Sequence, residues 1–593
     1  MKTKLIQIFL VITIFLFQGF SIYFTETFVI KPIVGEHFLP VTNIPFPYLF
    51  NTFLLFFFYS ILFFLSQKVF FSFLLSLNLF ILLALIHAFK LKYLGSVLFL
   101  TDFYAAGLKT VFAVFPGLGW KFFLLLFLTV FSISIFLYLY ILLYQKEKNS
   151  ILSWAYRINL FLVPFSLILF YLNPEASFEN FYRDVFRLKP NYMNTQIHYQ
   201  TQGLLLSLLD NYKVLYRQTK PETYPQALES ELDSYKSKPG KKVSLNVILI
   251  LAETFWDPLQ YPSLQISPDP IPFFRSLAQK NGGKIIVPGF GGGTVLTEFE
   301  VLTGLSTQLV WGYPYVSAVH REVPSLASVY TSAKYKTSFL HSYHGWFYDR
   351  SRVVPLLGFN EFQYDKHFFR EFQDEVIEDE RYIIDEYFIK KLNREIKKKS
   401  PFFIFASNYA THGPYNKTAI RKHYKIGNTT LSSLHKEHLQ ANLNLLHNFD
   451  NNLEKLLEDL KTLKEPVLLV VFGDHVPNEN YLGFSLRDYS DKDIDNFTCP
   501  YFAWSNVEIA KFPEKLSSNY LGLYLLKNSF PKDLPVFYRI LEKVETTLPV
   551  FSFYKSTTEG KLYKNLPENY EKVIELYKLI QYDLLYGEKL SFP

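Results

Sequence analysis

Residues 466–477 read PVLLVVFGDHVP, and this stretch predicts a buried strand with polar residues at its end. The apolar residues from Val467 to Phe472 lie between a proline and a glycine. Such a run is typical of a strand that is covered on both faces in a parallel sheet. Asp474 and His475 follow at the expected carboxyl end, which is the edge where open α/β sheets hold their ligands. An adjacent carboxylate and imidazole at that edge suit a divalent metal ion.

Three other apolar runs also end in polar residues. NVILILAE ends at Glu253, KTSFLH ends at His341, and FFIFASN leads to His412. Polar stretches with helical patterning, such as 385–399, lie between these runs, and this alternation is the pattern of an α/β domain. We therefore expect residues 244–556 to form an α/β domain with a mostly parallel central sheet, and the polar strand ends to meet at one edge.

The composition of the chain indicates a membrane part followed by a water-soluble part. Of the 593 residues, 49% are hydrophobic and 19% are aromatic, which exceeds what an ordinary soluble domain carries. The excess lies in the first 172 residues. A net charge of +7 favours contact with anionic lipid and is no nucleic-acid signature. The single cysteine, Cys499, excludes an intrachain disulfide.

Five apolar segments have about the length that a helix needs to cross a bilayer. The first follows Lys2 and Lys4, and a cleaved signal peptide is its alternative interpretation. No small-residue cleavage site follows it and further apolar segments do, which favours an anchor. The predicted five-helix transmembrane domain, residues 1–172, has spans at 5–24, 50–66, 69–88, 122–144 and 153–172.

Five spans that begin inside place the rest of the chain outside the cytoplasmic membrane, in the periplasm or its equivalent, and the basic residues partly support this orientation. Those on the expected cytoplasmic side are Lys2, Lys4, Lys68, Lys146, Lys148 and Arg157. Segment 89–121 is an exception, because it carries Lys90, Lys92, Lys109 and Lys121 on the expected outer side. Since it is apolar and aromatic, it is either an amphipathic element in the outer interface or a loop packed on the helices.

Two further segments flank the α/β domain. Residues 173–243 are polar and are predicted to form a linker. Residues 557–593 are predicted to form a C-terminal tail of peripheral helix and irregular chain, to which no chemistry is assigned.

A glycine-rich turn precedes a threonine in the sequence PGFGGGTVLTEFEVLTGLS, residues 288–306. Gly291 to Gly293 allow backbone conformations that other residues avoid. The turn can therefore expose the hydroxyl of Thr294 and direct backbone N–H groups toward an anion. A helix that begins near Thr294 would bury Phe299, Leu302 and Leu305 on one side and place its positive end at the site.

A threonine hydroxyl is a poor nucleophile at neutral pH, and metal coordination corrects this. Glu253, Asp474 and His475 supply two carboxylates and an imidazole, and Thr294 supplies a fourth ligand. The alternative is that Thr294 only caps its helix and that Glu253 pairs with a lysine. Because these residues follow several strands of one domain, the pattern favours a metal site with a nucleophile poised to attack phosphorus.

Five motifs of the chain resemble, in their order, those of the lipoteichoic acid synthase-like phosphoglycerol transferases of the alkaline phosphatase and sulfatase superfamily. The motifs are LAETF with Glu253, FGGGTVLTEFEVLTGLS with Thr294, HSYHGWFYDR with His341 and Arg350, SNYATHGPY with His412, and VVFGDHVPN with Asp474 and His475. The multi-span anchor and the external sulfatase-like domain also match this family, so the resemblance covers nearly the whole chain.

The resemblance implies one divalent metal ion, usually manganese, with magnesium or zinc as alternatives. The positions of Glu253, Thr294, Asp474 and His475 would bind it, and the threonine would be the nucleophile. It also implies that a glycerophosphoryl headgroup moves from phosphatidylglycerol to the threonine, releasing diacylglycerol, and then to an acceptor hydroxyl of an envelope glycan or polymer.

The resemblance also implies the residues that bind the substrate. Arg350 and His412 fall where the family binds the phosphate and glycerol parts, and His341 falls on a further family histidine. Tyr348 stands where relatives have tryptophan, and the histidine motif is lengthened to SNYATHGPY. Both departures lie on the substrate side, so they bear on the transferred headgroup more than on the metal.

Several other functions are compatible with this fold class. A sulfatase needs a cysteine or serine in a C/S-x-P-x-R setting, and Cys499, followed directly by Pro500, does not fit. A two-zinc phosphatase needs a second ligand set, for which the spacing gives no support. A phosphoethanolamine transferase acting on lipid A or a glycan uses the same threonine chemistry and is the nearest alternative. A non-catalytic membrane-anchored binding protein would be expected to have lost a ligand or the threonine, and none is lost.

Overall fold

The computed structural model describes two compact units, which divide near Lys220. Described are residues 2–34, 40–41, 44–94, 97–98, 154–172, 182, 185–186, 188, 195–216, 221, 223–232 and 245–592, the last range without 311–312, 346, 373–382, 399–400, 416–418, 428–430, 479–480, 482–496, 532, 553–554 and 557–569.

The first unit contains long apolar helices. Helix α1 (Lys2–Phe24) continues through a π-helical segment, Thr25–Ile30, into α2 (Lys31–Val34); α3 (Pro45–Ser66), α4 (Val69–Leu94) and α8 (Trp154–Leu172) follow. Among the described residues, three stretches are long and apolar enough to cross a membrane: Phe9–Val34, Pro45–Ser66 and Val69–Lys92.

The predicted spans 5–24, 50–66 and 69–88 overlap these three stretches, whose bounds differ from the predicted ones. The predicted span 153–172 is helical as α8. The predicted span 122–144 lies outside the described residues, so the total of five stays a prediction.

Two helices within the predicted linker belong to the first unit. Asn51 of α3 receives hydrogen bonds from the backbone N–H groups of Leu205 and Leu206, at 2.9 and 3.1 Å. Its amide donates to the Gln202 carbonyl. Asn51 thus links the end of α10 (Thr195–Gln202) to the start of α11 (Leu204–Tyr216). A later part of the linker, α12 (Gln226–Leu232), belongs to the second unit.

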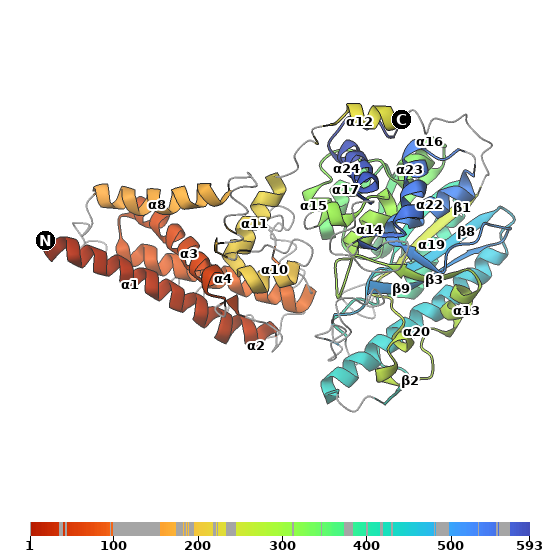
Figure 1. Ribbon diagram of the computed structural model, residues 1–593. Coiled ribbons are helices and arrows are strands. Elements are labelled where there is room, and N and C mark those ends of the chain that lie inside the picture. Colours follow the sequence, from red (N-terminus) through yellow and green to blue (C-terminus); the bar gives the residue numbers. More distant parts are fainter. Residues whose placement is uncertain are drawn as a thin grey trace. The chain divides into compact units, whose positions relative to one another are not determined.

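Among the described residues, the second unit is built on an eight-stranded sheet in the order β10-β3-β9-β8-β1-β6-β4-β5. Figure 1 labels β1, β3, β8 and β9 of this sheet. The strands are β1 (Asn246–Ala252), β3 (Gly282–Ile286), β4 (Lys336–His341), β5 (Glu361–Gln363), β6 (Phe402–Ser407), β8 (Val467–Gly473), β9 (Thr498–Ser505) and β10 (Lys515–Ser517). Strand β1 pairs in parallel with β6 and β8, while β9 runs antiparallel to β3 and β8. The predicted mostly parallel sheet is confirmed.

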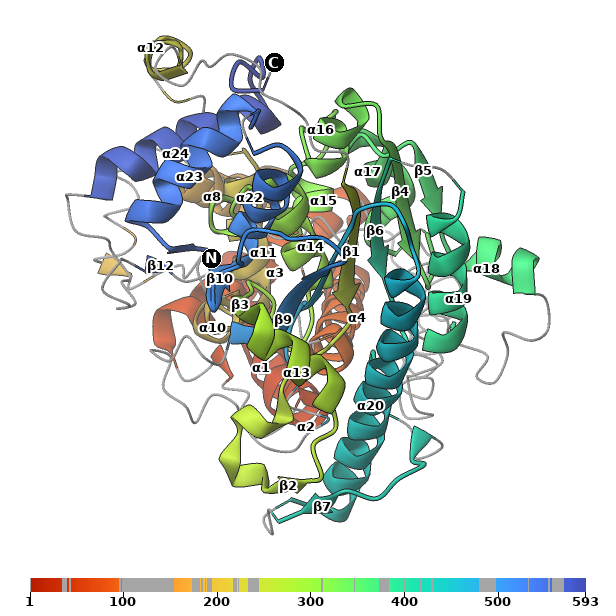
Figure 2. The same ribbon diagram turned by 90° about the vertical axis from the view of Figure 1, so that its right-hand side faces the viewer.

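Helices cover both faces of this sheet (Figure 2). On one face, α13 (Pro272–Lys280), α19 (Asp385–Ile396) and α20 (Ser433–Lys461) share a buried apolar core with strands β1, β6 and β8. On the other lie α14 (Thr294–Thr303), α16 (Leu326–Ser332), α22 (Ser518–Ser529) and α23 (Val536–Thr547). Further helices of this unit are α15 (Pro314–Ser317), α17 (Arg350–Leu356) and α18 (Asp365–Phe372). Outside the main sheet, β2 (Ile266–Ser267) pairs with β7 (Lys425–Ile426), and β11 (Val550–Phe551) pairs with β12 (Lys555–Ser556).

The predicted helix after the glycine-rich turn is confirmed as α14, and its apolar face is buried as expected. Phe299 and Leu302 are fully buried, and so is Leu305, which lies beyond the end of the helix at Thr303. The C-terminal helix α24 (Glu571–Leu585) binds the segment that follows α14. The Tyr577 hydroxyl donates to the Gly304 carbonyl at 2.6 Å, and the Gln581 amide donates to the Ser306 carbonyl at 3.0 Å. The described part of the tail therefore helps to fix the helix that carries Thr294.

Cys499 lies in β9, beside the end of β8. Its side chain is buried, and burial raises the pKa of the thiol well above its ordinary value.

Candidate active site

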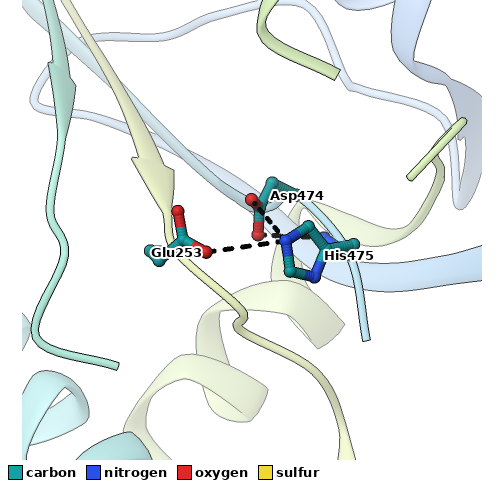
Figure 3. A group of neighbouring side chains, drawn as sticks. All are labelled: Glu253, Asp474 and His475. Atoms are coloured by element: carbon teal, nitrogen blue, oxygen red, sulfur yellow. Dashed lines mark hydrogen bonds and ion pairs between the residues drawn. The ribbon is translucent and has the colours of Figure 1, made fainter. Parts of the chain in front are cut away.

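The ends of β1 and β8 bring three candidate metal ligands together. The two strands are parallel neighbours with Ala252 opposite Gly473, so the residues that follow leave the sheet side by side. Glu253, Asp474 and His475 are all buried, and each offers a ligand atom within 4.8 Å of the others (Figure 3).

The imidazole of His475 presents a lone pair to this group. Its Nδ1–H donates to the Val476 carbonyl at 2.9 Å, which leaves Nε2 as the unprotonated nitrogen of the neutral ring. Nε2 lies 3.3 Å from Asp474 Oδ2 and 3.5 Å from Glu253 Oε1. Burial lowers the pKa of His475, so the ring is neutral near pH 7 and suited to a cation.

One oxygen of Asp474 is open to a cation. Oδ1 receives hydrogen bonds from the backbone N–H groups of Thr254 and His475, at 2.7 and 2.9 Å. Oδ2 is buried and has no hydrogen-bond donor among the described residues. Burial and the neighbouring Glu253 carboxylate raise the pKa of Asp474 well above its ordinary value. Two buried acids with an unsatisfied oxygen and a neutral imidazole fit a divalent cation.

The hydroxyl of Thr294 joins this group. Thr294 is the first residue of α14 and follows Gly293, whose φ of 86° lies in the left-handed region that glycine tolerates. Its Oγ1 donates to Glu253 Oε2 at 3.0 Å and lies 3.5 Å from His475 Nε2. One turn later, the Thr297 hydroxyl donates to the Asp474 carbonyl at 2.8 Å, which ties the helix to the end of β8.

Residues of the loop after β6 hold the backbone of Glu253. Its N–H donates to Asn408 Oδ1 at 2.7 Å, and its carbonyl accepts a hydrogen bond from the Thr411 hydroxyl. The Asn408 amide donates to Asp385 Oδ1 at 2.8 Å. The motif SNYATH therefore contributes to the position of Glu253 as well as supplying His412.

Arg350 is fully buried and forms an ion pair with Glu298. The sequence patterns did not single out Glu298. The Arg350 Nη2 group donates to Glu298 Oε2 at 2.9 Å, and Nε lies 3.1 Å from Oε1. Arg350 Nη1 also lies 3.3 Å from His341 Nε2. Glu298 is one helical turn after Thr294, so the partner of Arg350 and the candidate nucleophile share one rigid helix. The signal in the sequence that could have identified Glu298 was an acidic residue on the buried face of α14.

Glu298→Gln is expected to lower the free energy of unfolding by about 3–5 kcal/mol, because it leaves the buried Arg350 charge without its counterion. Glu386→Gln is the matched control. Glu386 pairs with Lys390 at 2.8 Å, with about half of each side chain exposed, so its loss should cost less than about 0.5 kcal/mol. Denaturant unfolding of both variants measures the difference. Equal stabilities of the two variants would contradict the importance of the buried pair.

His412 lies at the end of a stack of aromatic rings. Its ring stacks on Tyr409 at 4.5 Å, and Tyr409 stacks on Tyr343 at 3.8 Å. Nδ1–H of His412 donates to the Gly413 carbonyl, which leaves Nε2 unprotonated in the neutral ring. Burial lowers the pKa of His412, and the nearby Glu253 carboxylate opposes this shift.

Tyr348 and His341 accompany Arg350. The Arg350 guanidinium lies 5.3 Å from the centre of the Tyr348 ring, and the backbone of Tyr348 has a φ of 55°. His341 ends β4 and is buried, and its Nδ1 has no hydrogen-bond partner within the described part of the chain. The structure thus gathers Glu253, Thr294, Asp474 and His475 in one group, and Arg350, His341 and Tyr348 in another.

The chain is similar to one family model and to individual known proteins. Residues 245–526 match the model of the Sulfatase family. The chain is 27% identical over 370 residues to a protein of Rhizobium meliloti (strain 1021) that is provisionally named for cyclic beta-1,2-glucan modification, with 58% of this chain and 55% of the relative covered. The chain therefore spans about half the length of this relative.

Two solved structures are similar to the chain. The Streptococcus pyogenes phosphoglycerol transferase GacH, in complex with sn-glycerol-1-phosphate, is 19% identical, with a TM-score of 0.49 and with 61% of this chain and 91% of that chain covered. The lipooligosaccharide phosphoethanolamine transferase EptA of Neisseria meningitidis is 12% identical, with a TM-score of 0.49 and with 86% of this chain and 95% of that chain covered.

Proposed function

Since residues 245–526 form a domain of the sulfatase and alkaline phosphatase superfamily, we propose that this chain is a membrane-anchored, metal-dependent phosphoglycerol transferase. It moves the headgroup of phosphatidylglycerol to an envelope glycan or polymer through a threonine-bound intermediate. The observation that carries this proposal is the Thr294 hydroxyl, which lies 3.0 Å from Glu253 Oε2 and 3.5 Å from His475 Nε2.

Glu253, Asp474, His475 and Thr294 would hold one divalent cation, with Mn²⁺ expected first and Mg²⁺ or Zn²⁺ as alternatives. When bound, such an ion lowers the pKa of a hydroxyl ligand and neutralises charge that develops on phosphate oxygens. The neutral tautomer of His475 and the open oxygen of Asp474 support this assignment.

In the first step, the Thr294 oxygen attacks the phosphorus of phosphatidylglycerol. The bond from phosphorus to the diacylglycerol oxygen breaks, and diacylglycerol leaves with the proton that the threonine has lost. In the second step, an acceptor hydroxyl attacks the same phosphorus, the bond to Thr294 breaks, and the acceptor proton returns to the threonine. A covalent intermediate of this kind divides one difficult transfer into two easier ones.

Arg350 and His412 are the proposed partners of the phosphate and glycerol parts, with Tyr348 and His341 beside the arginine. A guanidinium offers paired N–H donors to phosphate oxygens, and Glu298 fixes its orientation. Because Nδ1–H of His412 is hydrogen-bonded to the Gly413 carbonyl, Nε2 is the unprotonated nitrogen of the neutral ring. It is therefore suited to accept or pass a proton at an ester oxygen.

The proposal places the catalytic domain outside the cytoplasmic membrane, with the lipid donor in the outer leaflet. The three stretches of the described residues that are long and apolar enough to cross a membrane support a membrane anchor. The name of the Rhizobium meliloti relative supports a glycan as the acceptor.

The test uses the purified full chain with Mn²⁺ and phosphatidylglycerol or phosphatidylethanolamine, each labelled in its headgroup. We expect the glycerol label to be found on the peptide that contains Thr294. Label from phosphatidylethanolamine alone would make the chain a phosphoethanolamine transferase. If neither label becomes attached while the protein binds Mn²⁺, the covalent mechanism is wrong and a binding protein is the better interpretation.

A further inference from the structure

Thr254, which follows Glu253 directly, adopts an unusual backbone conformation. Its φ is 47°, in the left-handed region, and it is 3% exposed. A β-branched residue rarely adopts a positive φ, because its side chain crowds the backbone. Such strain persists only where the surroundings enforce it, and it is concentrated at functional sites.

The path of the backbone explains the turn but not the threonine. A Cβ added at Gly473 would lie 1.9 Å from the Phe255 carbonyl oxygen, so the chain after Glu253 passes directly against the end of β8. This close approach requires a sharp turn at residue 254. Glycine would make that turn without strain, and the presence of threonine therefore needs a reason in its side chain.

Thr254 contacts both acids of the candidate metal centre. Its backbone N–H donates to Asp474 Oδ1 at 2.7 Å, and its hydroxyl donates to Glu253 Oε1 at 2.7 Å. The two carboxylates come from different strands, and one residue donates to each. The second oxygens are directed elsewhere: Glu253 Oε2 accepts from Thr294, and Asp474 Oδ2 has no donor among the described residues.

We propose that Thr254 is a positioning residue of the metal centre, an inference that rests on the proposed function. It donates to one oxygen of each carboxylate and so fixes the orientation of both acids at the metal centre. Hydrogen bonds from neighbouring groups fix the direction of carboxylate ligands in this way, and their loss typically weakens metal binding. The turn itself supplies the backbone N–H donor, whatever the side chain, as long as residue 254 is not proline. Only threonine or serine would supply the hydroxyl donor.

Substitutions at residue 254 separate these two contributions. Thr254→Gly keeps the N–H and relieves the strain but removes the hydroxyl, and Thr254→Ser keeps both donors. The full chain in detergent is stripped with a chelator and titrated with Mn²⁺ by calorimetry, and its unfolding temperature is measured without metal. We expect Thr254→Gly to bind Mn²⁺ about 10–100-fold more weakly with an unfolding temperature that is unchanged or raised. Thr254→Ser should bind within about threefold of the wild type.

Lys334→Gly is the matched control, because Lys334 also has a positive φ, 69°, and lies in an exposed turn. It should leave Mn²⁺ affinity unchanged. If the wild type binds Mn²⁺ and Thr254→Gly binds it equally well, the role of Thr254 is refuted while the proposed function stands. The same holds if Thr254→Ser binds as weakly as the glycine variant. If the wild type itself takes up none of Mn²⁺, Mg²⁺ and Zn²⁺, both the proposed function and this inference fail.

Discussion

Thr294→Ala is expected to lower the release of diacylglycerol from phosphatidylglycerol by roughly 10⁴-fold or more, because the variant lacks the atom that forms the bond to phosphorus. The change removes one hydroxyl that lies among the side chains of the candidate metal centre, 3.0 Å from Glu253 Oε2 and 3.5 Å from His475 Nε2, so the fold should be retained. The measurement is the initial rate with labelled phosphatidylglycerol and Mn²⁺. In addition, the headgroup label should become covalently attached to the wild-type protein and not to the variant.

Thr303→Ala is the matched control for this experiment. Thr303 is the last residue of the same helix and is buried, but its hydroxyl donates to the Phe299 carbonyl at 2.6 Å within the helix. Its loss should change stability modestly and leave the rate per folded molecule nearly unchanged. A Thr294→Ala protein that releases diacylglycerol at the wild-type rate would show that another group attacks the phosphorus.

Asp474→Asn is expected to weaken Mn²⁺ binding by more than about a hundredfold, since the loss of a residue that only supports a ligand already costs 10–100-fold. The amide keeps the shape of the side chain but removes the negative charge. It also offers an N–H group where, within the described part of the chain, a buried acceptor oxygen has no donor. Headgroup transfer should fall with metal occupancy. Titration of the chelator-stripped full chain with Mn²⁺ measures the affinity directly.

Asp450→Asn distinguishes loss of a ligand from loss of any buried acid. Asp450 lies in α20 and accepts hydrogen bonds from the N–H groups of Phe273 and Phe274, at 3.0 and 2.7 Å, at the start of α13. Its replacement should lower stability and leave Mn²⁺ affinity intact. Equal losses of affinity in both variants would place the effect in the fold rather than in the site.

The strands that form the centre of the sheet were predictable, because each is a short, wholly apolar run with clear boundaries. Strand β8 ends at Gly473, and Asp474 follows it as expected. Strand β9 was not singled out, although it lies beside β8, because its antiparallel direction depends on the rest of the sheet. The sequence TCPYFAWS carries no signal of strand direction.

The candidate ligands were predictable for a related reason: parallel strands place their following residues at one edge, so the gathering of Glu253, Asp474 and His475 follows from topology. The residues that orient them were not predictable. Glu298 and Thr254 look like an ordinary helix acid and an ordinary polar residue, and their partners become evident only when the backbone brings distant segments into contact. Hydrogen-bond partners across more than 200 positions, as between Thr254 and Asp474, leave no periodic pattern.

The buried state of Cys499 has a practical consequence for mapping how this protein is threaded through a bilayer. It is the only thiol in the chain, and it lies inside the sheet with its pKa raised by burial. Because maleimide reagents react with exposed thiolates, we expect the native protein to react with them very slowly. A single cysteine introduced into any loop would then report from which side a membrane-impermeant reagent reaches it, without prior removal of the natural residue.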